Sequence, residues 1–322
     1  MKRILVTGAT GFVGRALCPA LIEAGYGVAA AVRGENAADF LKGVEVICVG
    51  DIGPATDWTT ALKGMDGVVH LASRVHVINE TAADPEAEYA SINIEGTRRL
   101  AEAAAQAGVG RFVFLSTIKV NGETSLDGSF SEDDEPEPGD AYGRTKWEGE
   151  KVLHKIAEAS NMEAVVLRPP LVYGPGAKGN FLTLLNICHQ APPLPLGAVA
   201  NRRSLIYLGN LVDAILTALE HQAAAGGTYL VCDGGDVSTP GLIRLIAHSL
   251  GRPARLFWTP APLLRLAGKI TGKSDMVTRL LDTLSVNDRK IRSELGWTPP
   301  FTMKQGVEET AAWFLSRVAE KG

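Results

Sequence analysis

The chain has 322 residues, of which 46% are hydrophobic and 21% charged, and its formal net charge at pH 7 is −4. This composition is that of an ordinary globular protein, and the length suits one doubly wound domain with a smaller lobe. The net negative charge gives no reason to expect a nucleic-acid partner, and no apolar run approaches the roughly 18 residues of a membrane span, so no membrane partner is expected.

Short β-branched runs alternate with helical patterns through the first half of the chain. Strands are expected at residues 4–7, 28–32, 44–49, 67–72, 112–116 and 165–168, and helices at 12–24 and 88–107. Such alternation predicts a parallel sheet covered by helices on both faces, with right-handed crossovers. The fold class is therefore α/β.

Prolines interrupt the second half of the chain, where helices are expected at 181–189, 208–220, 242–250 and 307–319. The acidic, proline-containing stretch 131–138 is interpreted as a solvated surface turn. The four cysteines (Cys18, Cys48, Cys188 and Cys232) are far apart and include no CxxC pair. Neither a disulfide framework nor a metal site is indicated, so a reducing cytoplasm is the expected location.

A glycine-rich turn joins the first strand to the first helix. Its three glycines stand where a backbone must turn tightly, approach a pyrophosphate and let the helix pack on the sheet. The helix N-terminus adds free N–H groups and a positive dipole end. The turn predicts a dinucleotide site, whose contacts are expected from Gly8, Thr10, Gly11, Phe12, Val13 and Gly14.

The second strand ends without the acidic residue that many NAD enzymes use to bind the ribose hydroxyls. Arg33 stands there instead, and its planar guanidinium suits a 2′-phosphate. NADP(H) is therefore the favoured cofactor. Because Glu35 is close in the sequence, NAD(H) stays possible, and Arg33 would then be a surface arginine.

Tyr142 and Lys146 form a YxxxK pattern, and residues four apart lie on one face of a helix. The ordinary pKa of a phenol, about 10, is too high for a general base at neutral pH. A neighbouring ammonium is expected to lower it, so that Tyr142 exchanges a proton with a hydroxyl or ketone while a nicotinamide transfers hydride. Lys146 is also expected to hold the nicotinamide ribose.

These features resemble the extended short-chain dehydrogenase/reductase family, which includes nucleotide-sugar epimerases, dehydratases and 4-ketoreductases. The likeness is carried by the TGxxGxxG spacing, by Thr117 placed 25 residues before Tyr142, and by residues 91–97, 168–175, 208–213 and 294–299. It implies a doubly wound parallel Rossmann sheet with a smaller C-terminal α/β substrate lobe. Residues 1–170 would form the dinucleotide-binding domain, with 204–232 returning to it, and 171–203 and 233–322 would form most of the substrate lobe.

The resemblance also implies roles for individual residues. Thr117 would hydrogen-bond the reacting oxygen beside Tyr142 and Lys146. Further cofactor contacts would come from Asp51 and Ile52 at the adenine, from Leu71, Ala72, Ser73 and Pro169 near the nicotinamide, and from Asn93, which braces the sheet. A UDP-sugar would be bound through its diphosphate by Asn180 and Arg203, through its uracil by the backbone at Leu196, and through its sugar or a phosphate by Lys119.

The favoured function is that of an NADPH-dependent 4-ketoreductase of a UDP-4-keto-6-deoxy sugar in surface-polysaccharide synthesis, because Arg33 favours NADP. The alternative is a UDP-glucose or UDP-N-acetylglucosamine 4-epimerase with tightly bound NAD. A different ketone substrate and a non-catalytic dinucleotide-sensing regulator are also considered, although the intact Thr117, Tyr142 and Lys146 argue against the regulator. Relatives commonly dimerise through helices near 88–107 and 142–159, so a homodimer is possible.

Overall fold

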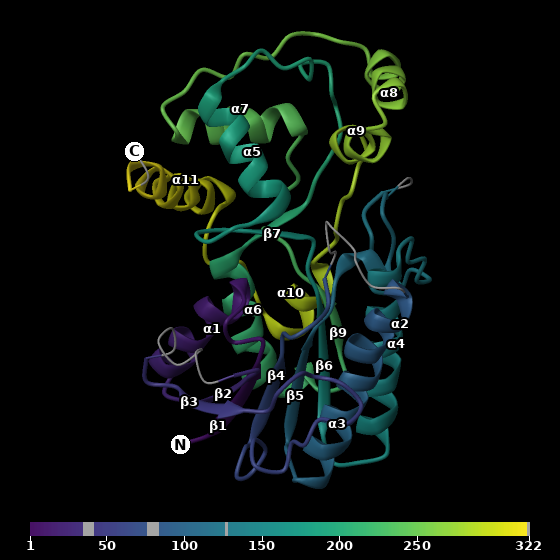
Figure 1. The fold of residues 1–322 in the computed structure, drawn as a ribbon, viewed down its shortest axis with the longest axis vertical. Helices are drawn as coiled ribbons and strands as arrows, with labels where there is room; N and C mark the ends of the chain where they lie inside the picture. Colours follow the sequence, from purple (N-terminus) through teal and green to yellow (C-terminus); the bar gives the residue numbers. More distant parts are fainter. Residues whose placement is uncertain (35–41, 76–83, 126–127, 321–322) are drawn as a thin grey trace.

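A computed structural model describes residues 1–34, 42–75, 84–125 and 128–320. Its centre is a seven-stranded parallel sheet in the order β3-β2-β1-β4-β5-β6-β9 (Figure 1). The strands are β1 Arg3–Thr7, β2 Gly27–Val32, β3 Glu45–Cys48, β4 Gly67–His70, β5 Arg111–Leu115, β6 Glu163–Arg168 and β9 Thr228–Leu230. The strand order reverses between β1 and β4, and doubly wound folds bind ligands at the carboxyl ends of the strands beside that point.

Helices cover both faces of this sheet. One face packs against α1 (Phe12–Glu23), α6 (Leu208–Glu220) and α10 (Arg289–Leu295). The other packs against α3 (Thr97–Gln106) and α4 (Ala141–Glu158). The central strands are buried on both sides, which is why they are continuously apolar rather than alternating.

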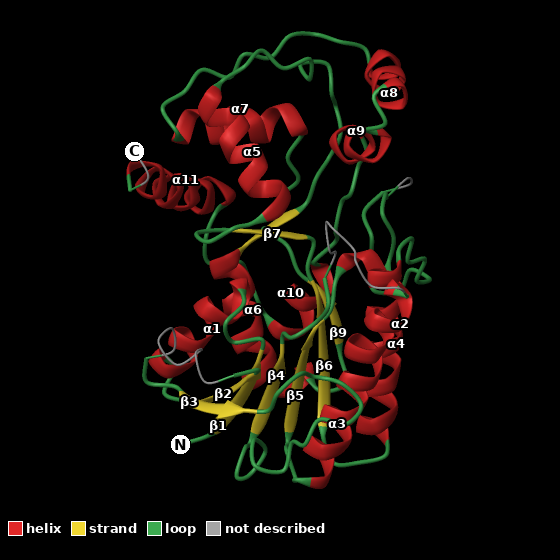
Figure 2. Ribbon diagram, viewed as in Figure 1, coloured by secondary structure: helices red, strands yellow, loops and turns green. Residues whose placement is uncertain are grey.

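A second lobe lies beyond the carboxyl ends of the strands (Figure 2). It contains a parallel pair of short strands, β7 (Leu171–Tyr173) and β8 (Leu205–Tyr207), and a separate apolar core. Its helices are α5 Gly179–Gln190, α7 Thr239–Ser249, α8 Ala261–Ile270, α9 Ser274–Leu281 and α11 Met303–Ala319. Within the described residues, no helix is both long and apolar enough to cross a membrane.

The expected strands and the Rossmann-type α/β fold class are confirmed. The helix expected at 88–107 is instead α2 (Pro85–Ala90), a π-helical turn η2 (Ser91–Gly96) and α3. The sequence did not predict the short helices α8, α9 and α10 or the short strands β7, β8 and β9. The proposed domain bounds stay a prediction.

The acidic stretch 131–138 is not entirely the solvated turn that was expected. The Glu132 carboxylate is half-buried and accepts a hydrogen bond from the Leu230 N–H of the edge strand β9, at 2.7 Å. Burial raises the pKa of Glu132. The Glu132 side chain thus satisfies one N–H donor of the edge strand, which would otherwise be unpaired. Asp133, Asp134 and Glu135 beside it are exposed.

Candidate active site

The glycine-rich turn has the shape of a phosphate cradle. Gly8 has φ +68°, in the left-handed region that favours glycine. A Cβ on Gly14 would lie 2.4 Å from the Gly8 carbonyl oxygen and 2.5 Å from the Ala9 Cα. Gly11 begins α1 without a side-chain cap, so the first N–H groups of the helix remain available to an anion. These features fit a dinucleotide pyrophosphate.

A pocket of about 580 Å³ opens beyond the carboxyl ends of β2 and β3, where the sequence predicted the adenosine contacts. It is lined by Arg33, Val49, residues 51–57, Arg74, Glu88, Ser91 and Ile92. The Arg33 Nε lies 3.1 Å from Asp51 Oδ1, and both side chains are largely exposed. The cation expected to bind a 2′-phosphate is therefore paired with a carboxylate on the same pocket wall. Glu35 lies outside the described residues.

The loop after β4 is held by buried polar contacts. His70 Nδ1 lies 2.6 Å from Thr7 Oγ1, which also accepts a hydrogen bond from the Ala72 N–H at 3.2 Å. Asn93, in the π-helical turn, bonds both backbone groups of Arg74 and donates to Thr145 Oγ1 at 3.1 Å. Asn93 thus ties the loop that carries Leu71, Ala72 and Ser73 to helix α4.

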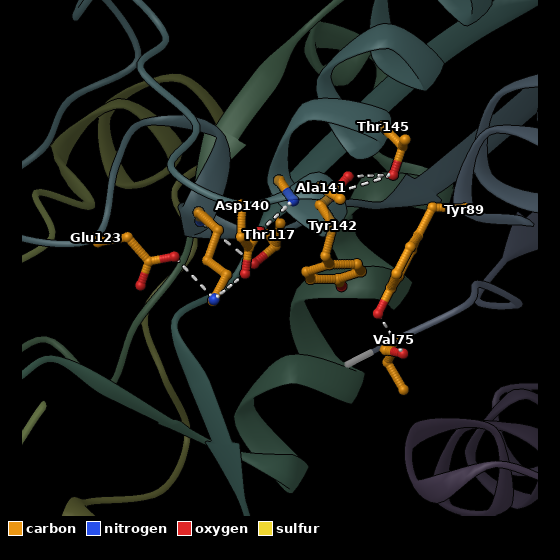
Figure 3. A network of polar contacts seen from close by, with 10 residues as sticks. Val75, Tyr89, Thr117, Glu123, Asp140, Ala141, Tyr142 and Thr145 are labelled. Carbon is orange, nitrogen blue, oxygen red and sulfur yellow. Dashed lines mark hydrogen bonds and ion pairs between the residues drawn. The ribbon is translucent and has the colours of Figure 1, made fainter. Parts of the chain in front are cut away.

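The side chain of Tyr142 meets this loop from α4. Its phenol hydrogen-bonds with Ser73 and Thr117, and its ring lies between Thr117 and Tyr89 (Figure 3). Burial raises the pKa of Tyr142 to about 12, and the two hydrogen bonds only partly offset the burial. The structure thus brings together Thr117, Tyr142 and Ser73, from three separate segments.

Lys146 lies one turn further along α4 and is buried. Its Nζ is 3.7 Å from the centroid of the Phe114 ring, and burial lowers its pKa to about 7 against the attraction of Glu150. The pKa of Tyr142 is thus raised overall, whereas the sequence predicted a lowered value from the neighbouring Lys146. Desolvation is the larger effect, and it disfavours the charged form of both groups.

A buried ionic network lies beside helix α4. Glu150 and Arg168 form an ion pair at 2.6 Å, with side-chain exposures of 0% and 4%. Ser116 donates to Glu150, and Arg168 also donates to Asn121 Oδ1 at 3.0 Å. Ser116 and Thr117 therefore turn to different partners, as the alternation of side chains along an extended segment requires.

Asp140 has two roles at the start of α4. Its Oδ1 accepts the Gly143 N–H at 2.7 Å and so caps the helix, while its Oδ2 lies 2.5 Å from Lys119 Nζ. Lys119 also contacts Glu123 at 2.9 Å (Figure 3). Burial lowers the pKa of Lys119, but the hydrogen bonds to the two carboxylates outweigh it and hold the pKa above its ordinary value.

The other expected substrate residues lie in the second lobe or at its base. Asn180 is exposed in the first turn of α5. Arg203 is half-buried, and burial lowers its pKa against the attraction of the Asp282 and Glu123 carboxylates. Glu123 thus acts on both Lys119 and Arg203.

Backbone groups at two further expected ligand contacts, Leu196 and Pro169, already form hydrogen bonds within the protein. The Leu196 carbonyl accepts the Val199 N–H at 3.2 Å, and the N–H of the next residue, Gly197, donates to the Phe257 carbonyl at 3.0 Å. The Pro169 carbonyl accepts the Ile118 N–H at 2.9 Å, which joins the loop after β6 to the segment that follows β5. The roles of Leu196 and Pro169 toward ligands remain predictions.

Sequence reasoning missed several residues at the site. Asp140 had a usable signal, because an aspartate before a helical pattern is a typical N-cap. Arg74, Glu88 and Tyr89 had none, since their position depends on the path of the loop after β4. Arg74 lies over the Tyr89 ring at 5.5 Å and reaches Glu88 at 3.7 Å.

Comparison with known proteins agrees with this arrangement. Residues 4–232 match the model of the NAD dependent epimerase/dehydratase family. The chain belongs to that family. It is therefore an enzyme of the extended short-chain dehydrogenase/reductase type, as its sequence resemblance implied.

Individual relatives cover nearly the whole chain. It is 44% identical to a UDP-glucose 4-epimerase of Vibrio cholerae, over 98% of this chain and 96% of the relative. It is 29% identical to the N-acetyl-alpha-D-glucosaminyl-diphospho-ditrans,octacis-undecaprenol 4-epimerase of Escherichia coli O157:H7, over 95% and 93%. The crystal structure of UDP-glucuronic acid 4-epimerase from Bacillus cereus in complex with NAD superposes with a TM-score of 0.78 at 25% identity, over 97% and 96%.

Proposed function

We propose that this enzyme is an NAD-dependent UDP-hexose 4-epimerase that interconverts UDP-glucose or UDP-N-acetylglucosamine with its C4 epimer. The observation that carries this proposal is the contact between Arg33 and Asp51 at the adenosine pocket. A carboxylate beside the ribose suits a free 2′-hydroxyl and repels a 2′-phosphate, which carries negative charge. NAD is thereby favoured over NADP, in contrast to the preference drawn from the sequence.

The relatives support the same choice. The Vibrio cholerae protein, with 44% identity, is a UDP-glucose 4-epimerase, and the superposed Bacillus cereus epimerase is in complex with NAD. The 4-ketoreductase interpretation depended on Arg33 as a free cation. Its pairing with Asp51 weakens the reason to prefer a reductase that consumes NADPH.

The chain's own residues supply the proton transfer. When bound, the nicotinamide supplies the acceptor and donor of hydride for C4. Tyr142 takes the proton of the C4 hydroxyl and later returns it, while the Thr117 hydroxyl hydrogen-bonds the same oxygen. The pKa of Tyr142 is about 12, so phenolate formation needs a nearby positive charge. Lys146 is one turn away on the same helix and is placed to provide it.

The remaining polar groups suit a nucleotide diphosphate. Lys119 and Arg203 are both cationic, and the Glu123 carboxylate attracts both of them electrostatically. A substrate diphosphate would replace carboxylate partners with phosphate oxygens, to which guanidinium and ammonium groups bind well. None of these groups distinguishes a C2 hydroxyl from a C2 acetamido group, so the proposal covers both hexoses.

The test begins with the cofactor. Protein purified without added dinucleotide is denatured, and the released molecule is identified by mass spectrometry. Near-stoichiometric NAD is expected, because an epimerase regenerates its cofactor in each cycle. NADP, or an empty protein that oxidises NADPH with a UDP-4-keto-6-deoxy sugar, would reject the proposal in favour of the reductase.

Turnover is then measured without added cofactor. NMR spectroscopy should show UDP-glucose or UDP-N-acetylglucosamine converting to its C4 epimer. Tyr142→Phe should lower the rate by about 10²–10⁴-fold while bound NAD is retained. Tyr26→Phe is the control, because its hydroxyl contacts Glu220 at the opposite end of the sheet. Equal activity of both variants would exclude Tyr142 as the acid–base group.

A further inference from the structure

The outer end of the second lobe exposes large apolar side chains. Among the described residues, twelve large hydrophobic side chains are exposed, and six of these fall within residues 257–276. They are Phe257, Trp258, Leu263, Leu266, Ile270 and Met276. Trp258 and Ile270 are 73% and 77% exposed. Such a concentration is unusual on a protein surface that contacts only water.

Helix α8 organises part of this surface. Leu263, Leu266 and Ile270 are spaced three and four residues apart, so they lie along one side of the helix. The opposite side is packed: a Cβ on Gly268 would lie 2.8 Å from a methyl carbon of Val277 in α9. The helix is therefore amphipathic, with its outward side apolar and its inward side against the lobe.

The same segment is strongly cationic. Residues 237–274 contain no aspartate or glutamate, although the net charge of the chain is −4. They contain six cations, Arg244, Arg252, Arg255, Arg265, Lys269 and Lys273. Within the described part of the chain, a carboxylate partner is seen only for Arg265, which contacts Asp282 at 2.6 Å. Lys269 and Lys273 are exposed beside the apolar side of α8.

We propose that this surface, which we call the α8 face (residues 252–276), docks on a membrane rich in anionic lipid. An amphipathic helix with leucine, isoleucine and neighbouring aromatic residues inserts its apolar side at the level of the lipid headgroups. Flanking lysines and arginines are attracted to anionic headgroups, and exposed tryptophan is favoured at that interface. The docking is peripheral, and it departs from the expectation that the protein has no membrane partner.

A second copy of the chain fits this surface poorly. In a two-fold dimer the same patch meets itself, so the cations around α8 would face their own copies. Like charges directly opposed across an interface are unfavourable, and in the sequence of the α8 face Asp275 is the one carboxylate against five lysines and arginines. An anionic bilayer supplies the missing negative charge together with an apolar layer.

Docking is separable from catalysis. Helix α8 lies at the far end of the second lobe, whereas Tyr142 lies on α4 beside the seven-stranded sheet (Figure 1). Changes at Leu266, Ile270, Lys269 and Lys273 are therefore expected to leave the residues of the proposed reaction in place. The inference does not depend on the identity of the sugar, and the two proposals can fail independently.

The full chain is tested by flotation with phosphatidylcholine vesicles that contain about 30% phosphatidylglycerol. The wild-type protein should float with these vesicles at low salt, and much less with pure phosphatidylcholine or at about 0.5 M salt. The double variant Leu266→Glu, Ile270→Glu should bind at least about tenfold more weakly. The double variant Lys269→Gln, Lys273→Gln should bind more weakly and lose part of the salt dependence.

Val318→Glu on α11 is the matched control, because Val318 is also an exposed apolar residue but lies outside the α8 face. It should float like the wild type, and all variants should keep the catalytic rate on soluble substrate. Three results would overturn the proposal. The first is a wild-type protein that does not float with the vesicles, and the second is glutamate variants that float as well as the wild type. The third is a molar mass, measured by light scattering, that differs between the wild type and the Leu266→Glu, Ile270→Glu variant, which would make the face an interface between copies.

Discussion

At the scale of single residues, the candidate site places two ionisable groups where their charged forms are unfavourable. Burial raises the pKa of Tyr142 to about 12 and lowers that of Lys146 to about 7. Both shifts have desolvation as the largest cause. The phenolate and the ammonium would each stabilise the other, so the pair is suited to exchanging one proton during a reaction rather than to holding a permanent charge.

The depressed pKa of Lys146 predicts a pH-dependent stability. The unfolded chain keeps this proton up to pH 10.5, while the folded protein releases it above about pH 7. The folded state therefore gains stability as the pH rises between these values, by about 1.4 kcal/mol for each pH unit. Denaturant unfolding of the wild type and Lys146→Met at pH 7 to 9 measures the effect.

As the pH rises, the free energy of unfolding of the wild type should increase relative to that of Lys146→Met. Lys155→Met, near the end of the same helix, is the control, and its difference from the wild type should stay flat across the range. A flat difference for Lys146→Met as well would mean that the ammonium is stabilised in the folded protein.

At the scale of elements, the turn between β1 and α1 is specified by local geometry. A side chain at position 14 meets backbone atoms of the turn itself, which cannot move away as the end of a flexible side chain can. The glycine spacing was readable from the sequence because it depends only on the strand, the turn and the helix. The sequence indicated a structural role for Asn93 but not its hydrogen-bond partners, because these lie in the loop after β4 and in helix α4.

Gly14→Ala is expected to distort the turn and weaken NAD binding by at least about tenfold, because the added methyl must displace the Gly8 carbonyl. Gly235→Ala is the matched control, since nothing lies within 4 Å of a Cβ built there. Fluorescence titration with NADH on protein freed of its own cofactor gives both affinities. Normal binding by Gly14→Ala would show that the turn adapts and that the close contact is not decisive.

At the scale of the whole molecule, the sheet domain and the second lobe are joined by a half-buried carboxylate. Asp233 follows β9 and accepts hydrogen bonds from the Tyr207 N–H at 2.7 Å and from Asn210 at 2.8 Å. Tyr173 of β7 donates to the same carboxylate at 2.8 Å and also contacts the Met303 carbonyl. Burial raises the pKa of Asp233, and these three donors oppose that shift.

Tyr173→Phe should lower the free energy of unfolding by about 1–3 kcal/mol, because a half-buried carboxylate oxygen loses its donor. Tyr26→Phe removes an exposed hydrogen bond to Glu220 and should cost about 0.5 kcal/mol or less. Chemical denaturation followed by circular dichroism compares the two. Similar small losses in both variants would show that water replaces the Tyr173 hydroxyl at Asp233.

The sequence by itself determined the parallel sheet, the phosphate turn and the catalytic pattern. Each depends on spacing within a single strand, turn or helix, and such spacing is visible along the chain. Thr117 and Tyr142 were paired through the family resemblance, and the structure brings them into contact. The roles of the individual site residues, the domain bounds, the location and the dimer stay predictions.

Only the tertiary structure decided the charge state and partners of these residues. Arg33 could not be paired with Asp51, nor Lys119 with Asp140, because their closeness depends on how separate segments come together. The pKa of Tyr142 was predicted in the wrong direction because sequence spacing shows a neighbouring charge but not the loss of water around it. Desolvation is a property of the packed molecule, since every surrounding segment contributes to it.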